Sequence, residues 1–450
     1  MNGKSGVQRE QWGSRWGFVM AAAGSAIGLG NIWRFPYLVG QNGGAAFVVV
    51  YLAIIALIGF PVMMCEISVG RASQKAPYAA FSGVGGHPVW NLIGWTAIIT
   101  GGFLVLSYYN VIGGWTIKYM VESFAGLMDV AEGGGSGEFF GHFISKKHEV
   151  IFFQVIFMGL VMLMVAGGVK GGIERACKIM MPALFIILIV LIVRSLSLPG
   201  AEAGIRFYLY PDFTKLTGKG ILAALGQAFF SLSLGLGAML AYGSYLSRDE
   251  NIPSAAAWAC GLDTLIALLA GFAIFPAVFA MGFEPDAGVG LSFITLPAVF
   301  AKMPAGMTFS FLFFLLLFFA AVTSAMSLLE AAVSFAIEKY EMKRADAVVV
   351  MGIIIILLGG YSALSLSGDP KIFGKDFLDV VDEFCNNWLL PLGSLALCVF
   401  VGWFWCEPAC KEVTSDGEFN FSWLNMWVFC VRFVAPVGIV IIFLNALGLI

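Results

Sequence analysis

The chain has 450 residues, of which 60% are hydrophobic and 12% charged, and its mean hydropathy is +0.90. A water-soluble chain cannot bury that much apolar surface, and a soluble domain of ordinary composition carries about 25% charged residues. The charges nearly cancel, to a net −3, which argues against a protein that binds nucleic acid. We therefore expect an all-α integral membrane protein.

Metal-centre and redox chemistry are not indicated by the sequence. The eight cysteines are scattered through or beside apolar segments, and the three histidines lie far from them in polar connections. No phosphate-binding loop of the G-x-x-x-x-G-K-[ST] type and no cluster of nucleophile and base is visible. These observations favour a protein that is not an enzyme and is not driven by nucleotide hydrolysis.

Stretches of about 20 or more apolar residues, bounded by charges or turn clusters, predict about 11 transmembrane helices. They cover residues 14–38, 45–70, 88–122, 149–168, 173–194, 220–246, 254–282, 306–338, 346–366, 378–405 and 420–449. No polar block is large enough to form a soluble domain. Residues 1–450 are therefore expected to form a single transmembrane domain.

The distribution of Lys and Arg predicts how these helices are oriented. With the N-terminus in the cytoplasm, roughly half of the basic residues fall in short inner connections, with clusters at 170–178 and 339–344, as the positive-inside rule requires. Eleven spans then place the C-terminus outside, in a multi-pass protein of the cell (plasma) membrane. The acidic, glycine-rich segment 123–148 is expected to be a surface loop on the outer side.

Glycine clusters interrupt the first and the sixth spans in the same manner. The sequence Ile27-Gly28-Leu29-Gly30 in the first is echoed by Leu234-Gly235-Leu236-Gly237 in the sixth. Each glycine costs about 1 kcal/mol of helix propensity relative to alanine, so both helices are predicted to break at bilayer depth, where freed backbone groups need a cavity and a polar occupant. The recurrence suggests two related halves. Glycines that merely permit tight helix packing are the alternative, but the Ser and Asn residues embedded in the breaks favour the first interpretation.

The eighth span carries Ala320, Thr323, Ser324 and Ser327 on one helical face, at i, i+3, i+4 and i+7. Hydroxyl and carbonyl oxygens are hard ligands suited to an alkali or alkaline-earth cation. Helix packing, with each hydroxyl bonded to its own helical turn, explains the stripe alone equally well.

Ionisable residues at bilayer depth are costly and are functional candidates. Arg34 directly follows the first break, and Asp382 opens the tenth span on the same outer side, so the two are placed to pair across an entrance. Glu66 and Glu330 are interpreted as structural hydrogen-bond centres rather than as transport groups.

Together these features resemble the neurotransmitter:sodium symporter family, and its bacterial amino-acid transporters in particular. The resemblance rests on the run Ala21 to Pro36 (AAAGSAIGLGNIWRFP), Asn42 to Gly44, Glu66 to Arg71, Tyr109 to Trp115, Gln227 to Gly237 and Phe319 to Ser324. It implies a leucine-transporter-like fold, an inverted five-helix repeat with broken helices 1 and 6. The repeats would be about 12–194 and about 220–405, followed by an extra helix at about 420–449.

The resemblance also implies two Na+ sites. The first would use the carbonyl of Ala26 and the side chains of Asn31, Ser231 and Asp263, completed by the substrate carboxylate. The second would use the carbonyls of Gly24, Ile27 and Ala320 and the hydroxyls of Thr323 and Ser324.

An amino-acid site between the broken helices is implied in the same way. The substrate carboxylate would meet the N–H groups of Leu29 and Gly30 and the hydroxyl of Tyr109, where a half-helix N-terminus favours an anion. The ammonium group would meet carbonyls near Ala26, Phe230, Ser231 and Ser233. The side-chain pocket would be lined by Val105, Tyr109, Phe230, Leu236, Ser324 and Leu328. Because this lining is mostly apolar, we expect neutral hydrophobic L-amino acids, aliphatic or aromatic, as substrates.

Gates are implied on both sides of the site. Arg34 and Asp382 would close the outer side, and Glu338 stands where relatives carry an inner-gate Asp, opposite Arg9 and near Trp12. Asp263 replaces the usual Asn of the family and puts a fixed negative charge beside the first sodium. We therefore expect transport that does not depend on chloride.

The expected function is sodium-coupled symport of an amino acid into the cell by alternating access. The expected partners are the amino acid, sodium ions and the lipid bilayer, with no nucleic acid and no evident obligate protein partner. An ion channel built on the same oxygens and a sensor that binds an amino acid without moving it are the alternatives.

Overall fold

The computed structural model describes residues 10–285, 290–368, 371–372, 374–447 and 449. Within these ranges, nine continuous helical segments are long and apolar enough to cross a membrane. They are Ala45–Ser73, Pro88–Ala125, Lys147–Ala166, Val169–Leu196, Ile252–Ala280, Gly306–Tyr340, Arg344–Ser365, Phe377–Phe404 and Leu424–Asn445. Each matches one predicted span to within about four residues at either end, because span length is set by the bilayer thickness.

Several of these segments are chains of helices joined by short π-helical turns, and one of them begins with a 3-10 turn, η3. The first half contains α3 (Ala45–Ile54), η2 (Ile55–Gly59), α4 (Phe60–Ser73), η3 (Pro88–Trp90), α6 (Asn91–Ala97), η4 (Ile98–Val105), α7 (Leu106–Ala125), α10 (Lys147–Ala166), η5 (Val169–Glu174) and α11 (Arg175–Leu196). The second half contains α15 (Ile252–Ala280), α17 (Gly306–Tyr340), α18 (Arg344–Ser365), α19 (Phe377–Phe384), η8 (Cys385–Leu389), α20 (Leu390–Val399), η9 (Phe400–Phe404), α22 (Leu424–Phe429), η10 (Cys430–Val434) and α23 (Ala435–Ala446).

The first and sixth spans are broken, as predicted. The first consists of α1 (Arg15–Ala26), η1 (Gly30–Arg34) and α2 (Phe35–Gln41), and the sixth of α13 (Gly218–Ser231) and α14 (Ala238–Gly243). In the sixth break, Ser233, Gly235 and Gly237 have φ angles of 54°, 75° and 76°. This left-handed conformation is open to glycine at little cost, and three such residues within the five from Ser233 to Gly237 cannot continue a right-handed helix.

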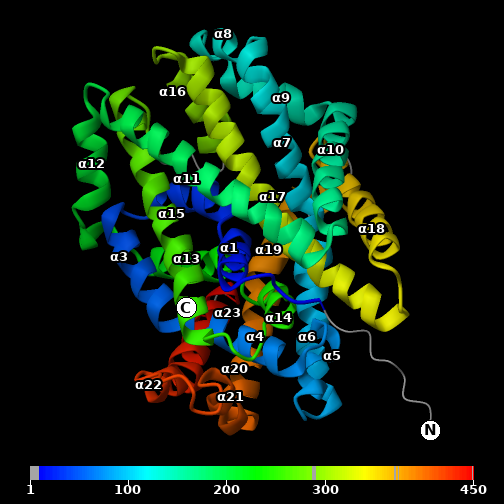
Figure 1. Cartoon of the computed structure of the whole chain (residues 1–450). Helices are drawn as coiled ribbons and strands as arrows, with labels where there is room; N and C mark the ends of the chain where they lie inside the picture. The colour runs from blue at the N-terminus through cyan, green and yellow to red at the C-terminus, as the bar shows by residue number, and fades with distance from the viewer. Residues whose placement is uncertain (1–9, 286–289, 369–370, 373, 448, 450) are drawn as a thin grey trace.

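The connections gather at opposite ends of the bundle. Figure 1 shows α8 (Leu127–Glu132), α9 (Ser136–Ser145), α12 (Ala201–Leu209) and α16 (Leu296–Ala301) toward one end, and α5 (Pro77–Gly83) and α21 (Cys406–Val413) toward the other. The remaining short elements are η6 (Phe213–Lys215), η7 (Leu291–Thr295) and an antiparallel pair of strands, β1 (Lys371–Ile372) and β2 (Lys375–Asp376).

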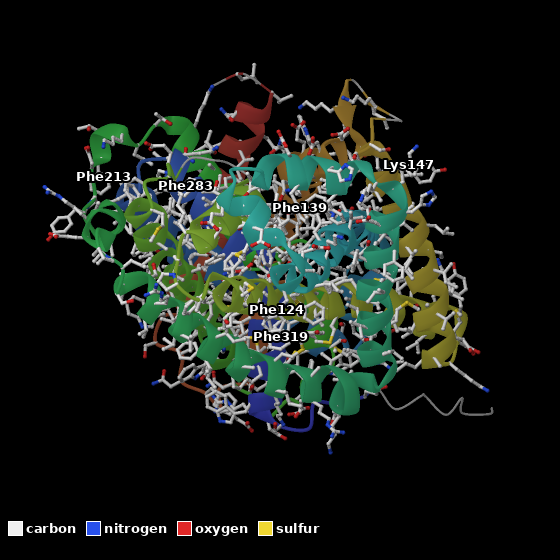
Figure 2. The ribbon with its side chains drawn as sticks, turned by 90° about the horizontal axis from the view of Figure 1, so that it is seen from above. Phe124, Phe139, Lys147, Phe213, Phe283 and Phe319 are labelled. Carbon is white, nitrogen blue, oxygen red and sulfur yellow. The ribbon has the colours of Figure 1, made fainter. Side chains whose placement is uncertain are left out.

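The expectation of an outer surface loop at 123–148 was wrong. This segment forms α8 and α9, which lie across the end of the bundle that is predicted to face outward. The glycines and acidic residues of the segment favoured a loop, but its apolar residues form one face of a helix. On this face, Phe139 and Phe143 contact the Tyr119 ring, and Phe140 stacks on Phe293. Seen from above (Figure 2), Phe139 lies near the middle of the molecule, between Phe213 and Lys147 at opposite edges.

Helix α17 runs through the interior of the bundle and carries the small-residue stripe. It contacts α1, α7, α11 and α14, and Figure 1 shows it passing obliquely through the centre. Its stretch from Ala320 to Ala336 is entirely buried. The stripe is therefore held against the break in the first span, which is where the candidate site lies.

Candidate functional site

The proposed ligands of the second sodium site converge between α1 and α17. Ser324 Oγ lies 3.4 Å from the carbonyl oxygen of Gly24 and 3.3 Å from that of Ile27. Thr323 Oγ1 lies 3.5 Å from the Ile27 carbonyl oxygen and 3.1 Å from that of Ala320. All five predicted ligands thus form one cluster of uncharged oxygens, the kind of ligand set that a hard monovalent cation accepts.

The close approach of the two helices depends on a glycine. A Cβ at Gly24 would lie 3.2 Å from Thr323 Cβ and 3.3 Å from Met181 Sδ. The fourth residue of the stripe, Ser327, accepts a hydrogen bond of 2.6 Å from the Ser25 hydroxyl. The stripe is therefore more than a packing face, since it binds the helix that ends at the break.

The side chains proposed for the first sodium site form a second cluster around Asp263. This carboxylate is completely buried and accepts hydrogen bonds from Asn31 Nδ2, at 2.7 Å, and from the Ser231 hydroxyl, at 3.0 and 3.1 Å. Asn31 Oδ1 accepts the Gly28 N–H at 3.0 Å. Sequence reasoning missed Tyr51, whose hydroxyl donates to Ser231 Oγ at 3.3 Å. A buried charge needs partners of this kind, and a cation would be a stronger one.

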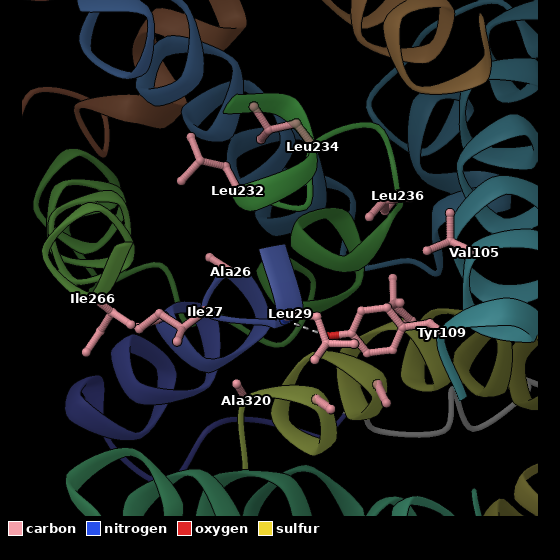
Figure 3. Packing of buried hydrophobic residues seen from close by; sticks show 14 of the residues in the cluster. Ala26, Ile27, Leu29, Val105, Tyr109, Leu232, Leu234, Leu236, Ile266 and Ala320 are labelled. Carbon is pink, nitrogen blue, oxygen red and sulfur yellow. Dashed lines mark hydrogen bonds between the residues drawn. The ribbon is translucent and has the colours of Figure 1, made fainter. Parts of the chain in front are cut away.

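The groups proposed for the substrate carboxylate lie at the start of η1. The Leu29 N–H donates to Tyr109 Oη at 3.2 Å, the bond drawn in Figure 3. Gly30 begins η1, and its carbonyl accepts a 2.7 Å hydrogen bond from Gln227 Nε2. The Leu29 N–H, the start of η1 and the Tyr109 hydroxyl thus lie together, and the N-terminal end of a helix favours an anion.

The proposed pocket residues surround the same region. Figure 3 shows Ala26, Leu29, Val105, Tyr109 and Leu236 close to the two breaks. Most of their neighbours are fully buried, whereas Ala26, Tyr109, Ser233, Leu236, Ser324 and Leu328 each retain 3–6% exposure. Val105 and Ser231 are at 1%, Leu29 at 0%, and Phe230 is half-buried. The residues predicted to line the amino-acid site therefore lie together beside the two breaks.

Gly28 lies at the point where the substrate and sodium residues meet. A Cβ at this position would lie 2.5 Å from Ser324 Oγ and 2.8 Å from Tyr109 Oη. Even one methyl group would therefore occupy the space between the α17 stripe and the proposed carboxylate contact.

Two buried glutamates, Glu66 and Glu330, form hydrogen bonds and an ion pair in the interior of the helix bundle. Glu66 on α4 accepts the Gly235 N–H at 2.7 Å and so binds a backbone group freed by the sixth break. Glu330 on α17 forms an ion pair with Arg344, at 2.8 Å, and accepts the Tyr245 hydroxyl at 2.6 Å. Both contacts agree with the interpretation of these residues as structural hydrogen-bond centres.

On the outer side, Arg34 and Asp382 are linked through a third residue. Arg34 Nη1 donates to Asn386 Oδ1 at 3.1 Å, and Asn386 Nδ2 donates to Asp382 Oδ1 at 2.7 Å. The Arg34 guanidinium also lies 4.7 Å from the centre of the Phe230 ring. The expected neighbours therefore meet over the site, with Asn386 as the bridge that the sequence did not reveal.

On the inner side, the partners of the expected gate are only partly described. Trp12 Nε1 donates to the Tyr242 carbonyl at 3.0 Å, and its ring lies against Phe18, Tyr242 and Tyr245. Glu338 Oε2 accepts the Ala76 N–H at 2.6 Å, next to α5. Arg9 lies outside the described residues, so its pairing with Glu338 stays a prediction.

Comparisons with known proteins agree with this geometry. The model of the "Sodium:neurotransmitter symporter family" matches residues 9–133 and 142–449. The "Uncharacterized sodium-dependent transporter YhdH" of Bacillus subtilis is 41% identical over 442 residues, covering 98% of each chain. An "Uncharacterized sodium-dependent transporter" of Haemophilus influenzae is 38% identical, again over 98% of each.

A solved structure matches the fold closely. The crystal structure of MhsT in complex with L-phenylalanine superposes with a TM-score of 0.89 at 43% identity, covering 98% of this chain and all of the other. The prediction of an all-α, leucine-transporter-like membrane fold is therefore confirmed. The chain belongs to the sodium:neurotransmitter symporter family.

Proposed function

We propose that this sodium-dependent transporter is a symporter that moves neutral hydrophobic L-amino acids into the cell together with two sodium ions. The observation that carries the proposal is the convergence of two oxygen clusters and one anion-binding point on the same break, Ile27 to Leu29. A cation at either cluster and a carboxylate at Leu29 and Tyr109 would each stabilise the conformation in which the others bind.

The substrate class follows from the charge and polarity of the pocket. The carboxylate contact uses backbone N–H groups and the Tyr109 hydroxyl, so the ligand supplies the negative charge that completes the first sodium site. The side chain of the ligand would face Val105, Leu236 and Leu328, which are apolar. MhsT, whose solved complex contains L-phenylalanine, is 43% identical to this chain, which supports aromatic as well as aliphatic substrates.

Sodium and amino-acid transport are proposed to be coupled because the residues that bind sodium lie on helices that move relative to one another. The second sodium site joins the end of α1 to α17, and the first joins η1 to α13 and α15. Ions and substrate would therefore be needed together to hold both halves of the broken spans in place. The Arg34, Asn386 and Asp382 side would open to load the site, and the Trp12 and Glu338 side would open to release it inward.

The membrane potential is sufficient to drive accumulation. Each unit charge moved through 100 mV is worth about 2.3 kcal/mol, so two sodium ions moving with a zwitterion supply about 4.6 kcal/mol. This corresponds to roughly a 10³-fold concentration ratio. No nucleotide is required.

Chloride is proposed to be dispensable because Asp263 already carries the negative charge beside the first sodium site. The test is uptake of labelled L-phenylalanine and L-leucine into proteoliposomes that carry the purified protein. An inward gradient of sodium gluconate should drive as much uptake as one of sodium chloride, and a potassium gradient should drive none. Uptake that is independent of sodium, or that requires chloride, would contradict the proposal.

A further inference from the structure

Aromatic rings surround the ammonium group of Lys339 at the end of α17 that is predicted to face the cytoplasm. Lys339 Nζ lies 4.3 Å from the centre of the Trp95 ring and 5.4 Å from that of Phe335. The centres of the Tyr340 and Tyr78 rings lie 5.7 and 6.0 Å from the same atom. A cation within about 6 Å of a ring centre is attracted by the ring, and most strongly by tryptophan. We call these rings, together with the lysine, the Lys339 cage.

The Lys339 cage joins three elements that are distant in the sequence. Tyr78 belongs to α5 and Trp95 to α6, whereas the other members belong to the last turns of α17. The rings also contact one another, since the centre of the Phe335 ring lies 5.1 Å from that of Trp95 and 5.4 Å from that of Tyr78. The cage therefore holds the end of α17 against α5 and α6, which lie next to each other in Figure 1.

The residue before Lys339 is the proposed inner-gate acid, Glu338. Its Oε2 accepts the Ala76 N–H at 2.6 Å, directly before α5. Two consecutive residues of α17 thus contact the same region, Glu338 through a hydrogen bond and Lys339 through the Tyr78 ring. The position of the acid and the position of the ammonium group are therefore linked.

The end of α17 depends on side-chain contacts of this kind. The helix ends at Tyr340, and the next residue, Glu341, has a φ angle of 54°. This left-handed conformation costs free energy in a residue that has a Cβ atom. Glu338 and Lys339 both lie in the last turn, and helix ends fray. An anchor on the last turn therefore also keeps the Glu338 carboxylate in place.

We propose that Lys339 is a positioning residue of the inner gate, whose ammonium group anchors the last turn of α17 on α5 and α6 and so holds Glu338 in place. The inference rests on the proposed function, in which the Glu338 side opens to release the substrate inward. Loss of the cation favours the state that is open to the inside, in which the sodium clusters at the first break are not assembled. The apparent affinity for sodium then falls, because a smaller fraction of the protein is competent to bind it.

The test is sodium-dependent binding of labelled L-phenylalanine to the purified protein over a range of sodium concentrations. Lys339 is exposed, and a cation–π contact at an exposed site changes an equilibrium by a factor of about two to five. Lys339→Gln should therefore raise the sodium concentration for half-maximal binding by about that factor. Lys339→Arg keeps a cation that stacks on aromatic rings and should restore the original value. Lys343→Gln, which removes another exposed lysine of the same connection, is the matched control and should leave the value unchanged.

A double variant separates the positioning of Glu338 from a general effect on stability. Glu338→Gln should itself raise the sodium requirement, and adding Lys339→Gln should raise it no further, because Lys339 acts through Glu338. A further rise of two- to fivefold in the double variant would overturn the proposal. An unchanged sodium requirement in Lys339→Gln, or an equal rise in Lys339→Arg, would also overturn it. Failure of the proposed function gives a different result, since the unaltered protein would then bind L-phenylalanine without sodium or not at all.

Discussion

Thr323→Val tests the second sodium site with the least disturbance of packing. Valine keeps the shape of threonine and removes only Oγ1, which lies 3.5 Å from the Ile27 carbonyl oxygen and 3.1 Å from that of Ala320. A hydrogen bond or equivalent contact to a charged group is worth about 1.5–3 kcal/mol. Loss of one of five ligands should therefore raise the sodium concentration for half-maximal binding by roughly 10- to 100-fold.

The assay is sodium-dependent binding of labelled L-phenylalanine, measured over a range of sodium concentrations. Ser334→Ala is the matched control, since Ser334 is also buried on α17 and its hydroxyl also bonds to its own turn, at Ala331, 3.0 Å away. The control should keep the original sodium dependence, and Thr323→Ser should restore most of it. A Thr323→Val protein with a sodium dependence within about twofold of the original would refute the assignment of this hydroxyl as a ligand.

Three further substitutions test other parts of the site. Gly28→Ala should abolish amino-acid binding, because its Cβ would lie 2.5 Å from Ser324 Oγ. The control Gly226→Ala, with no atom within 4 Å of the added Cβ, should bind the amino acid normally. Equal binding by both variants would place the substrate elsewhere. Tyr109→Phe should weaken amino-acid binding by roughly 10- to 100-fold through loss of one hydrogen bond to a carboxylate, and an unchanged affinity would remove this hydroxyl from the site. Arg344→Gln leaves the fully buried Glu330 without its cation and should cost about 3–5 kcal/mol of stability, seen as a lower unfolding temperature. The double variant with Glu330→Gln should recover most of this stability. A double variant as unstable as Arg344→Gln would show that Arg344 stabilises the protein through contacts other than this ion pair.

The features that could be predicted from the sequence are those set by local composition. Bilayer thickness fixes the length of each span, so hydropathy alone located the helices. The two breaks were visible because glycines at Gly28, Gly30, Gly235 and Gly237 are unfavourable in a helix. The stripe on the eighth span was equally visible, and its i, i+3, i+4 spacing correctly implied a single face.

The features that could not be predicted depend on contacts between distant segments. Asn386 bridges Arg34 and Asp382, but in the sequence it is only a polar residue within an apolar span. Arg344 was counted as a marker of the inner side, and its ion pair with Glu330 requires the chain between them to fold back. Tyr51 was missed because nothing in its local sequence points toward Ser231, 180 residues away.

Helices α8 and α9 were missed for a different reason. Six glycines and three acidic residues are spread through 123–148 and indicate a loop. The apolar residues between them have helical spacing, and their burial against Tyr119 and Phe293 decides the outcome. Tertiary packing therefore overrides the low helix propensity of the segment.

In the proposed function, sodium and an amino acid move through the protein together. Charge movement in proteoliposomes adsorbed to a solid-supported membrane tests it directly. Adding L-phenylalanine in the presence of sodium should produce an inward current, and adding either one alone should produce no sustained current. A sustained sodium current without the amino acid would mean a channel, and binding of L-phenylalanine without any current would mean a sensor; either result would contradict the account.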